Sequence, residues 1–349
     1  MTMSAKKRTS SSSSKKLNKK TKTSKKKSTP SRAKKKVSKK TAKKTAKKAA
    51  KKSAKKPTSP ASPPPSSTEE DFINSPLAVK KSLMQSMRIH GNEEKRRIAI
   101  DMLERYTGHN FEDFQKQIIL TNFHYYVERF NAILDDSHYT EGSAFKASSS
   151  KKAEVTIIEF GVGSAMAALI GELISVVEPK AVLFLGLCGA VHPSLKVGDF
   201  ILPIASIRAE GVSRHFLPRQ VPALPTFKVQ KFVSQILVEH GLEYRTGTIH
   251  STDFRFWEFD EKFKLNLMEE RVLAVEMETA ALFTTCFVSK VSIGALLLVS
   301  DCPLKPGGIK TKASAKSVFK KFTDKHIELG IEAMADIAER GENIRHYHW

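Results

Sequence analysis

The sequence predicts an α/β domain with a largely parallel or mixed central sheet, preceded by a disordered basic tail. Two observations support this: basic residues gather at one end, and short apolar strands alternate with helices along the rest. Of the 59 Lys and Arg residues, 25 lie within residues 1–56, which contain no Asp or Glu. The other 293 residues carry 34 basic and 36 acidic side chains, so the formal charge of +23 belongs to the tail. The nearly neutral body is therefore not expected to bind nucleic acid itself.

The tail, residues 1–56, consists mainly of Lys, Ser, Thr and Ala, and a Lys-Lys pair recurs every four residues from Lys39 to Lys56. Charge repulsion and the lack of apolar residues prevent a packed core, so disorder is expected. The repeat resembles the Lys/Ala-rich tails of linker histones. Two roles remain open: nonspecific nucleic-acid binding through phosphate charges, and a solubilising extension.

A Pro- and Ser-rich linker is expected over residues 57–75, and a catalytic domain over residues 76–349 with a short helical lead-in at 76–110. Within it, strands are predicted near residues 118–120, 155–160, 181–186, 200–207, 246–249, 272–275 and 293–300. Helices are predicted near 89–106, 164–178, 229–239, 276–288 and 313–340, the last one stopping at Gly341. Sheets of this kind bind ligands at the carboxyl ends of their strands, so chemistry is expected there.

The longest apolar stretch, Ala181 to Val191, is shorter than the ~20 residues that a membrane span requires. The N-terminus lacks the apolar segment of a secretory signal. Cys188, Cys286 and Cys302 lack the close spacing of a zinc site or a disulfide framework. We therefore expect a cytoplasmic protein with buried reduced thiols, no metal, no cofactor and no membrane partner.

Glycines and acids follow several of the predicted strands. Gly161 and Gly163 open a helix, where backbone N–H groups attract anions, but Met166 replaces the third glycine of a dinucleotide fingerprint. Taken alone, a tight strand-to-helix turn explains this motif better. Glu276 and Glu278 flank Met277 at the start of an apolar helix, and their carboxylates are suited to bind ribose hydroxyls; the alternative is acids favoured by the helix dipole.

Asp301 ends the most apolar strand, where burial raises a carboxyl pKa and suits it to act as a general acid. The alternative is a turn-forming Asp. The segment from Thr252 to Glu258 combines aromatics with Arg255, so it is suited to stack a base and pair a phosphate. The alternative is a loop that Trp257 and its neighbours pin to the core.

Together, these motifs resemble the nucleoside phosphorylase/nucleosidase superfamily. The resemblance rests on Phe160-Gly161-Val162-Gly163, Gly186-Leu187-Cys188-Gly189-Ala190-Val191, Gly198-Asp199, Val275-Glu276-Met277-Glu278-Thr279-Ala280-Ala281 and Val299-Ser300-Asp301. A closer resemblance to AMP nucleosidases, over about residues 95–349, adds Tyr106-Thr107-Gly108, Ile119 to Phe123, Ile207-Arg208, Thr252 to Glu258, and Pro303-Leu304 with Ile309-Lys310.

The resemblance implies a three-layer nucleoside phosphorylase-like body and a homo-oligomer, with a hexamer as one candidate. It also implies hydrolysis of AMP to adenine and ribose 5-phosphate, a reaction of purine salvage and nucleotide pool control. Asp301 matches the catalytic acid that protonates the purine, and Glu278 with Met277 matches the ribose-binding pair. Glu276 and Gly163 are expected to help bind substrate, and Lys310 to tune the Asp301 proton.

The sequence departs from the phosphorylases where they bind the attacking phosphate with an Arg and a Ser. Phe184 and Leu187 stand at those positions, so water is the expected nucleophile. Glu278 and Asn122 are the candidates to activate it. For the substrate 5′-phosphate we expect Arg208, Arg255 and Lys310, with Arg214 and His215 as weaker candidates, and Trp257 is expected to contact the substrate. Two other functions remain open: a purine nucleoside phosphorylase, and a nucleic-acid-binding protein with an enzyme-like body.

Overall fold

The computed structural model describes residues 89–340. The predictions for the tail, the linker, the lead-in before residue 89 and the helix stop at Gly341 lie outside this range.

A nine-stranded mixed sheet forms the centre of the domain, in the order β2-β3-β4-β1-β5-β8-β7-β6-β9. Because β9 also pairs with β5, the strands β5, β8, β7, β6 and β9 close into a ring. The strands are β1 (Gln117–Thr121), β2 (His138–Glu141), β3 (Lys146–Ser150), β4 (Val155–Glu159), β5 (Ala181–Ala190), β6 (Phe200–Ala209), β7 (Tyr244–Thr252), β8 (Ala274–Glu276) and β9 (Ile293–Asp301).

The prediction of a parallel or mixed sheet is confirmed. Strand β1 runs parallel to β4 and to β5, and β5 runs parallel to β9. Antiparallel pairs join β5 to β8 and β6 to β9. The carboxyl ends of β1, β4, β5 and β9 therefore meet at one edge of the sheet, where ligands bind in such folds.

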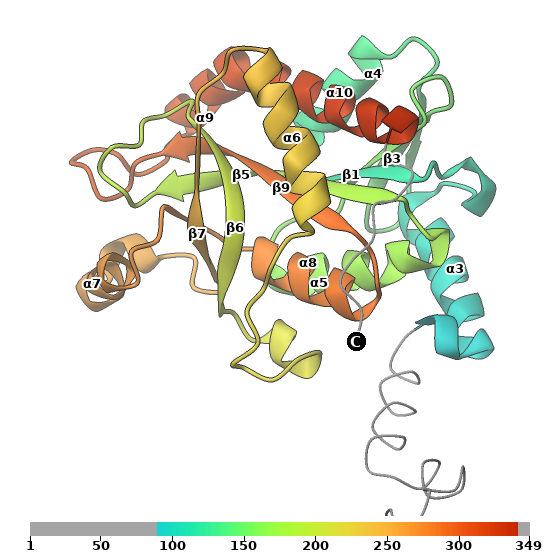
Figure 1. Ribbon diagram of the computed structural model, residues 1–349, viewed down its shortest axis with the longest axis horizontal. Coiled ribbons are helices and arrows are strands. Elements are labelled where there is room, and N and C mark those ends of the chain that lie inside the picture. Colours follow the sequence, from blue (N-terminus) through green and yellow to red (C-terminus); the bar gives the residue numbers. More distant parts are fainter. Residues whose placement is uncertain (1–88, 341–349) are drawn as a thin grey trace, which may run out of the picture. The chain divides into compact units, whose positions relative to one another are not determined.

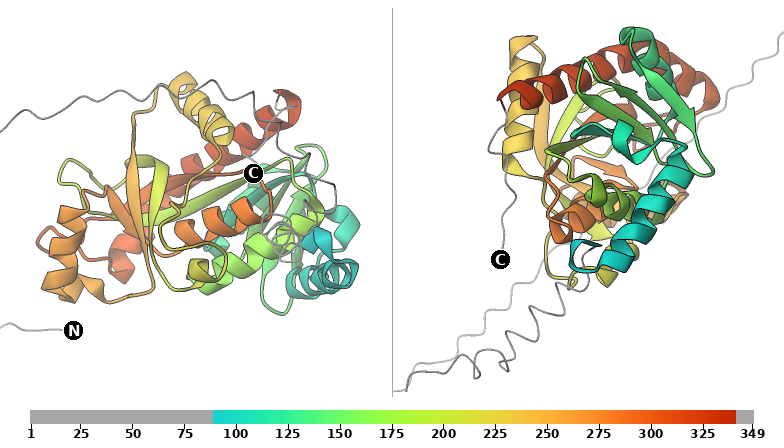
Figure 2. Two further views of the ribbon diagram at one scale, coloured as in Figure 1. Left: turned by 60° about the horizontal axis from the view of Figure 1, so that its bottom comes forward. Right: turned by 90° about the vertical axis from the view of Figure 1, so that its right-hand side faces the viewer.

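Helices cover both faces of the sheet, which gives the expected three layers (Figure 1). The helices α3, α5 and α8 pack on one face, and α4, α6 and α10 pack on the other; Figure 2 shows α6 and α10 side by side. The helices are α3 (Glu93–Thr107), α4 (His124–Ile133), α5 (Ser164–Leu173), α6 (Phe227–Glu239), α7 (Glu261–Glu269), α8 (Thr279–Val288), α9 (Lys312–Val318) and α10 (Asp324–Arg340). Strand β9 is buried along its whole length because both of its faces are covered.

The hairpin of β2 and β3 was not predicted, because Lys-Ala-Ser-Ser-Ser in β3 has no apolar periodicity. The structure buries these serines by pairing their hydroxyls: Ser148 donates to Asn131 at 2.6 Å, and Ser150 donates to Asp136 at 2.6 Å. Tertiary hydrogen bonds thus offset the cost of burying polar groups, which local sequence does not reveal.

Several element boundaries also differ from the prediction. The helix expected from residue 276 begins at Thr279, because Glu276 still belongs to β8. The single helix expected over 313–340 is interrupted by a π-helical turn, Phe319–Thr323. Helices α4 and α7 were not predicted. All three cysteines are buried free thiols, as expected. Within residues 89–340, no helix is long and apolar enough to span a bilayer.

Candidate active site

The predicted acids meet at the strand ends around Gly189 in β5. Gly189 pairs with Val275 in β8 on one side and with Asp301 in β9 on the other. A side chain at this position would lie 3.1 Å from Pro303 and 3.5 Å from an Asp301 carboxylate oxygen, so glycine allows the close approach. Glu276, which follows Val275, and Asp301 therefore flank the same backbone position.

Glu278 lies at the start of α8 and is buried. Its carboxylate accepts hydrogen bonds from the backbone N–H of Gly163 at 2.7 Å and from that of Met277 at 3.3 Å. Burial, together with the negative charge of Glu276, raises the pKa of Glu278 to about 8, although hydrogen bonds from Gly163, Met277 and Asn122 oppose the rise. Glu278 therefore changes charge near neutral pH, which suits a group that handles protons or developing positive charge.

Glu276 is also buried, but its hydrogen bonds lie within the protein. One carboxylate oxygen accepts from the backbone N–H groups of Glu278 at 2.7 Å and Thr279 at 2.6 Å, and the other accepts from the Ser251 hydroxyl. Burial raises its pKa, and these donors oppose the rise. Glu276 thus holds the first turn of α8 and places Glu278. Its expected direct role in binding ribose finds no support in this arrangement.

Asp301 ends β9, and only 9% of its surface is exposed. One of its carboxylate oxygens accepts a hydrogen bond from the Ser300 hydroxyl at 2.5 Å. The Lys310 ammonium in turn donates to Ser300 at 3.3 Å and lies 5.5 Å from the centre of the Phe123 ring. Burial raises the pKa of Asp301, whereas the Ser300 hydrogen bond and the Lys310 charge lower it. Lys310 thus lies beside the predicted acid, as expected for a residue that tunes its proton.

Asn122 follows β1 and lies close to Glu278. Its side chain hydrogen-bonds the Glu278 carboxylate, while its own amide oxygen is buried without a hydrogen-bond partner within residues 89–340. An unsatisfied buried acceptor costs free energy unless a ligand or water supplies a donor. Asn122, Gly163, Met277 and Glu278 therefore form one cluster.

Arg208 does not join this site. It is buried, and its five N–H donors bond the Ser213 hydroxyl and carbonyl oxygens from the following loop, at 2.7–2.9 Å. The carbonyl partners belong to Ser213, Leu217, Pro218 and Val221. No donor is left for a ligand, so the expectation of a phosphate-binding Arg208 is corrected: this side chain organises the loop. Arg214 and His215 lie on the surface of that loop.

Trp257 is likewise a structural residue. It is buried in a small cluster with Val191, Leu267, Val272 and Val275, with Leu304 packed against the cluster. This packing fits the alternative of a loop pinned by its aromatics, and contact of the indole with substrate stays a prediction. Arg255, by contrast, is half exposed and bonds Glu258 at 2.7 Å.

Phe184 and Leu187 offer no group for binding an anion. Phe184 is fully buried and packs on Phe160 with ring centres 5.9 Å apart, and Leu187 is also buried. Apolar side chains thus occupy the two positions at which the phosphorylases of the resembled superfamily carry an Arg and a Ser.

Two polar networks around the site were not predicted. The first is centred on Asp253, whose carboxylate accepts from the Ser164 hydroxyl at 2.9 Å and the Gly211 N–H at 2.8 Å. It joins the start of α5 to the loops that follow β6 and β7. The only feature of the sequence that pointed to this network was the Thr252-Asp253 pair.

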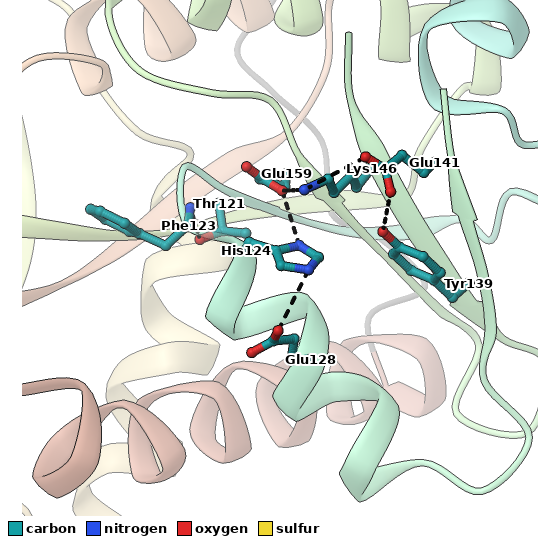
Figure 3. Close-up of polar contacts among 8 residues, drawn as sticks. All are labelled: Thr121, Phe123, His124, Glu128, Tyr139, Glu141, Lys146 and Glu159. Atoms are coloured by element: carbon teal, nitrogen blue, oxygen red, sulfur yellow. Dashed lines mark hydrogen bonds and ion pairs between the residues drawn. The ribbon is translucent and has the colours of Figure 1, made fainter. Parts of the chain in front are cut away.

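The second network surrounds Glu159, the last residue of β4 and the register partner of Thr121 (Figure 3). Glu159 lies 3.3 Å from His124 and 3.7 Å from Lys146. His124 also faces Glu128 at 3.6 Å. These partly exposed pairs are individually weak, but together they hold the turn that carries Asn122. No local sequence pattern predicted these ion pairs, because the residues that form them come from three different elements.

Comparison with known proteins agrees with this geometry. Residues 116–338 match the family model described as "Phosphorylase superfamily". The chain is 28% identical over 292 residues to AMP nucleosidase of Escherichia coli, covering 70% of this chain but only 60% of the bacterial protein. The crystal structure of AMP nucleosidase from Bacteroides thetaiotaomicron is 38% identical, with a TM-score of 0.63, and covers 71% of this chain and 99% of its own.

A purine nucleoside phosphorylase from Toxoplasma gondii shares the fold, with a TM-score of 0.58 and 18% identity over 66% of this chain and 95% of its own. The ring of strands, the acids around Gly189 and these matches agree with one another, and the chain therefore belongs to the phosphorylase superfamily, on its AMP nucleosidase branch.

Proposed function

We propose that this chain hydrolyses the N-glycosidic bond of AMP to give adenine and ribose 5-phosphate. One observation carries the proposal: two buried acids with raised pKa values, Asp301 at the end of β9 and Glu278 just after β8, follow the two strands that flank β5 in a member of the AMP nucleosidase branch. Such a pair suits a reaction that protonates a leaving base while positive charge develops on ribose.

In the proposed reaction, protonated Asp301 donates its proton to the purine N7. The bond between C1′ and N9 then breaks, and its electron pair leaves with adenine. The Glu278 carboxylate, which changes charge near neutral pH, stabilises in its ionised form the positive charge on the ribosyl oxocarbenium ion. Water, held by Asn122 and Glu278, adds its oxygen to C1′, and the proton it loses restores the proton of Asp301.

The buried Phe184 and Leu187 favour water over phosphate as the nucleophile, because neither donates a hydrogen bond or carries a charge. The test is product analysis of AMP cleavage with and without inorganic phosphate. Adenine and ribose 5-phosphate should form at the same rate in both buffers. Release that requires phosphate and yields ribose 1,5-bisphosphate would instead identify a phosphorylase.

We also propose assembly into a homo-oligomer and a cytoplasmic location. Phe254, Phe256 and Phe259 are exposed on the loop after β7, and Leu265 and Met268 are exposed on α7. A surface with this many large apolar side chains is typical of a subunit interface. The buried free thiols suit a reducing compartment. Light scattering coupled to gel filtration measures the assembly, and a monomer at micromolar concentration would refute it.

A further inference from the structure

An apolar groove lies between the loop that precedes α6 and the C-terminal half of α8. Its volume of about 620 Å³ falls within the range of roughly 300–1,000 Å³ that is usual for binding pockets. Large apolar side chains at its rim remain in water, since Leu224 is 46% exposed and Phe227 is 79% exposed. The apolar residues that line the groove include Leu217, Val221, Leu224, Phe227, Phe283 and Phe287.

A polar group inside this groove lacks a partner. Thr284 lines the groove, and only 1% of its surface is exposed. Its hydroxyl oxygen is buried and has no hydrogen-bond partner among residues 89–340. Such a hydroxyl costs free energy, which a ligand with its own donor or acceptor would offset. The groove therefore suits a ligand that combines apolar surface with a polar group, as the side chains of Tyr and Trp do.

The groove lies at the amino end of β9, near the end of α10. The backbone N–H of Thr226, a groove residue, donates at 2.7 Å to the carbonyl of Ile293, the first residue of β9. The carbonyl just before Ile293 accepts at 2.8 Å from the backbone N–H of Val182 in β5. Lys180, two residues before Val182, donates at 3.0 Å to the carbonyl of Ala338 in the last turn of α10. These hydrogen bonds connect the end of α10 to the groove across one edge of the sheet.

The chain continues beyond α10 with residues 341–349, Gly-Glu-Asn-Ile-Arg-His-Tyr-His-Trp, here called the C-terminal segment. Its large apolar and aromatic residues are Ile344, Tyr347 and Trp349. Nine residues span up to roughly 30 Å when extended. The groove residue Thr226 lies two strand spacings from β5, or roughly 10 Å. The C-terminal segment therefore has both the length to reach the groove and the side chains to fill it.

We propose that the C-terminal segment binds the groove of its own chain through Tyr347 and Trp349, and so covers the C-terminal half of α8. Because the segment is tethered to α10, its effective concentration at the groove is on the order of 1 mM. A tethered segment also loses less translational freedom on binding than a separate partner does. The inference is independent of the proposed reaction, because the groove and Asp301 lie at opposite ends of β9.

The first test uses Trp349 as the probe in the full-length protein. The chain contains two tryptophans, Trp257 and Trp349, so the difference in emission between wild type and Trp349→Phe reports on Trp349. A docked indole should emit at shorter wavelength and be protected from quenching by acrylamide. Leu224→Asp at the rim of the groove should abolish both effects, measured in the same way. Emission of a fully exposed indole in the wild type would overturn the proposal.

Val238→Asp is the matched control for this test. Val238 is a 63% exposed apolar side chain on α6, outside the groove, so an added carboxylate there should leave the Trp349 signal unchanged. Loss of the signal in Val238→Asp as well would show that any new surface charge disturbs it, which would contradict binding in the groove.

The second test adds a synthetic peptide of residues 341–349 to the full-length Tyr347→Ala/Trp349→Ala variant, whose own segment lacks both aromatics. Calorimetry should give a Kd of roughly 100 µM or lower, because a tethered segment at about 1 mM must bind that tightly to fill about nine grooves in ten. The peptide should bind neither wild type, in which the groove is filled, nor the same variant with Leu224→Asp added.

Equal binding of the peptide to wild type, or no binding to the Tyr347→Ala/Trp349→Ala variant, would overturn the proposal. The dependence of the Trp349 signal on protein concentration distinguishes one further case. Protection of Trp349 that disappears on dilution would place the segment in the groove of a second copy, and would overturn binding within one chain.

Discussion

The backbone N–H of Gly163 donates a 2.7 Å hydrogen bond to the carboxylate of Glu278, although 115 residues separate them in the chain. Gly163 has a φ of 98°, a conformation that side-chain-bearing residues rarely adopt, and this turns its N–H toward α8. The glycine motif at residues 161–163 and the acidic motif at residues 276–278 are therefore in direct contact in the folded protein. This bond, with those from Met277 and Asn122, opposes the rise in the pKa of Glu278 that burial and the Glu276 charge cause.

The proton on Asp301 is the first point to test. Asp301→Asn keeps the size of the side chain but cannot deliver a proton to the purine. Turnover of AMP should fall by roughly 100- to 10,000-fold, the usual contribution of a general acid. Circular dichroism should be unchanged, because the amide can still accept from Ser300. A folded variant with wild-type turnover would show that another group protonates the base.

Lys310 should set the alkaline limit of activity. Its positive charge lowers the pKa of Asp301, so Lys310→Met should raise that pKa and keep the acid protonated to higher pH. The descending limb of the pH–kcat profile should move upward in the variant. Lys305→Met is the control, because Lys305 bonds the Leu195 carbonyl instead. An unmoved limb would mean that Asp301 does not control it.

Glu278 should make the stability of the protein depend on pH. Its pKa is raised from its ordinary value of 4.5 to about 8 in the folded state. Between these values the folded chain binds more protons than the unfolded chain, so the free energy of unfolding should fall as the pH rises. Below about pH 4.5 and above about pH 8 this group adds no slope.

Urea unfolding at several pH values measures this effect, and Glu278→Gln should flatten the curve between pH 5 and pH 8. Glu243→Gln, a change at an exposed carboxylate, should leave it unchanged. An equal slope in wild type and Glu278→Gln would exclude a raised pKa for this group.

Arg208 should matter for stability and not for phosphate recognition. Arg208→Met would leave four loop carbonyls and the Ser213 hydroxyl without their donor. We expect a loss of roughly 3 kcal/mol in the free energy of unfolding, seen as a Tm lower by about 5–10 °C. Arg214→Met, in the same loop but on the surface, should change Tm little. A selective loss of AMP over adenosine turnover in a stable Arg208→Met protein would contradict this assignment.

The tail can be tested apart from the enzyme. Residues 1–56 carry 25 basic residues and no aromatic residue that could stack on bases. Any binding should therefore be independent of the nucleic-acid sequence. Affinity for DNA should drop by roughly 1,000-fold or more between 50 and 200 mM salt. Deleting residues 1–68 should abolish gel-shift retention and leave AMP cleavage nearly unchanged. Retention after truncation would place the nucleic-acid site on the body, and a large loss of cleavage would couple the tail to catalysis.

The sequence alone determined the features that repeat or alternate along the chain. Charge segregation separated the tail from a neutral body, and apolar runs located β1, β4, β5 and β9. The ordered motifs pointed to Asp301, which ends β9, to Met277 and Glu278, which follow β8, and to Gly163, which follows β4. Such signals are local, so one chain suffices to find them.

Only the tertiary structure decided what each polar side chain does. Arg208 and Arg255 are both cations on loops beside the site, yet one is enclosed by five hydrogen bonds and the other stays half exposed. Glu276 and Glu278 lie two residues apart, yet backbone donors at the start of α8 bind the first and leave the second beside Asn122. Burial and hydrogen-bond partners come from residues far away in the chain. They determine the pKa of an acid and the freedom of a cation, so residue type and spacing cannot supply them.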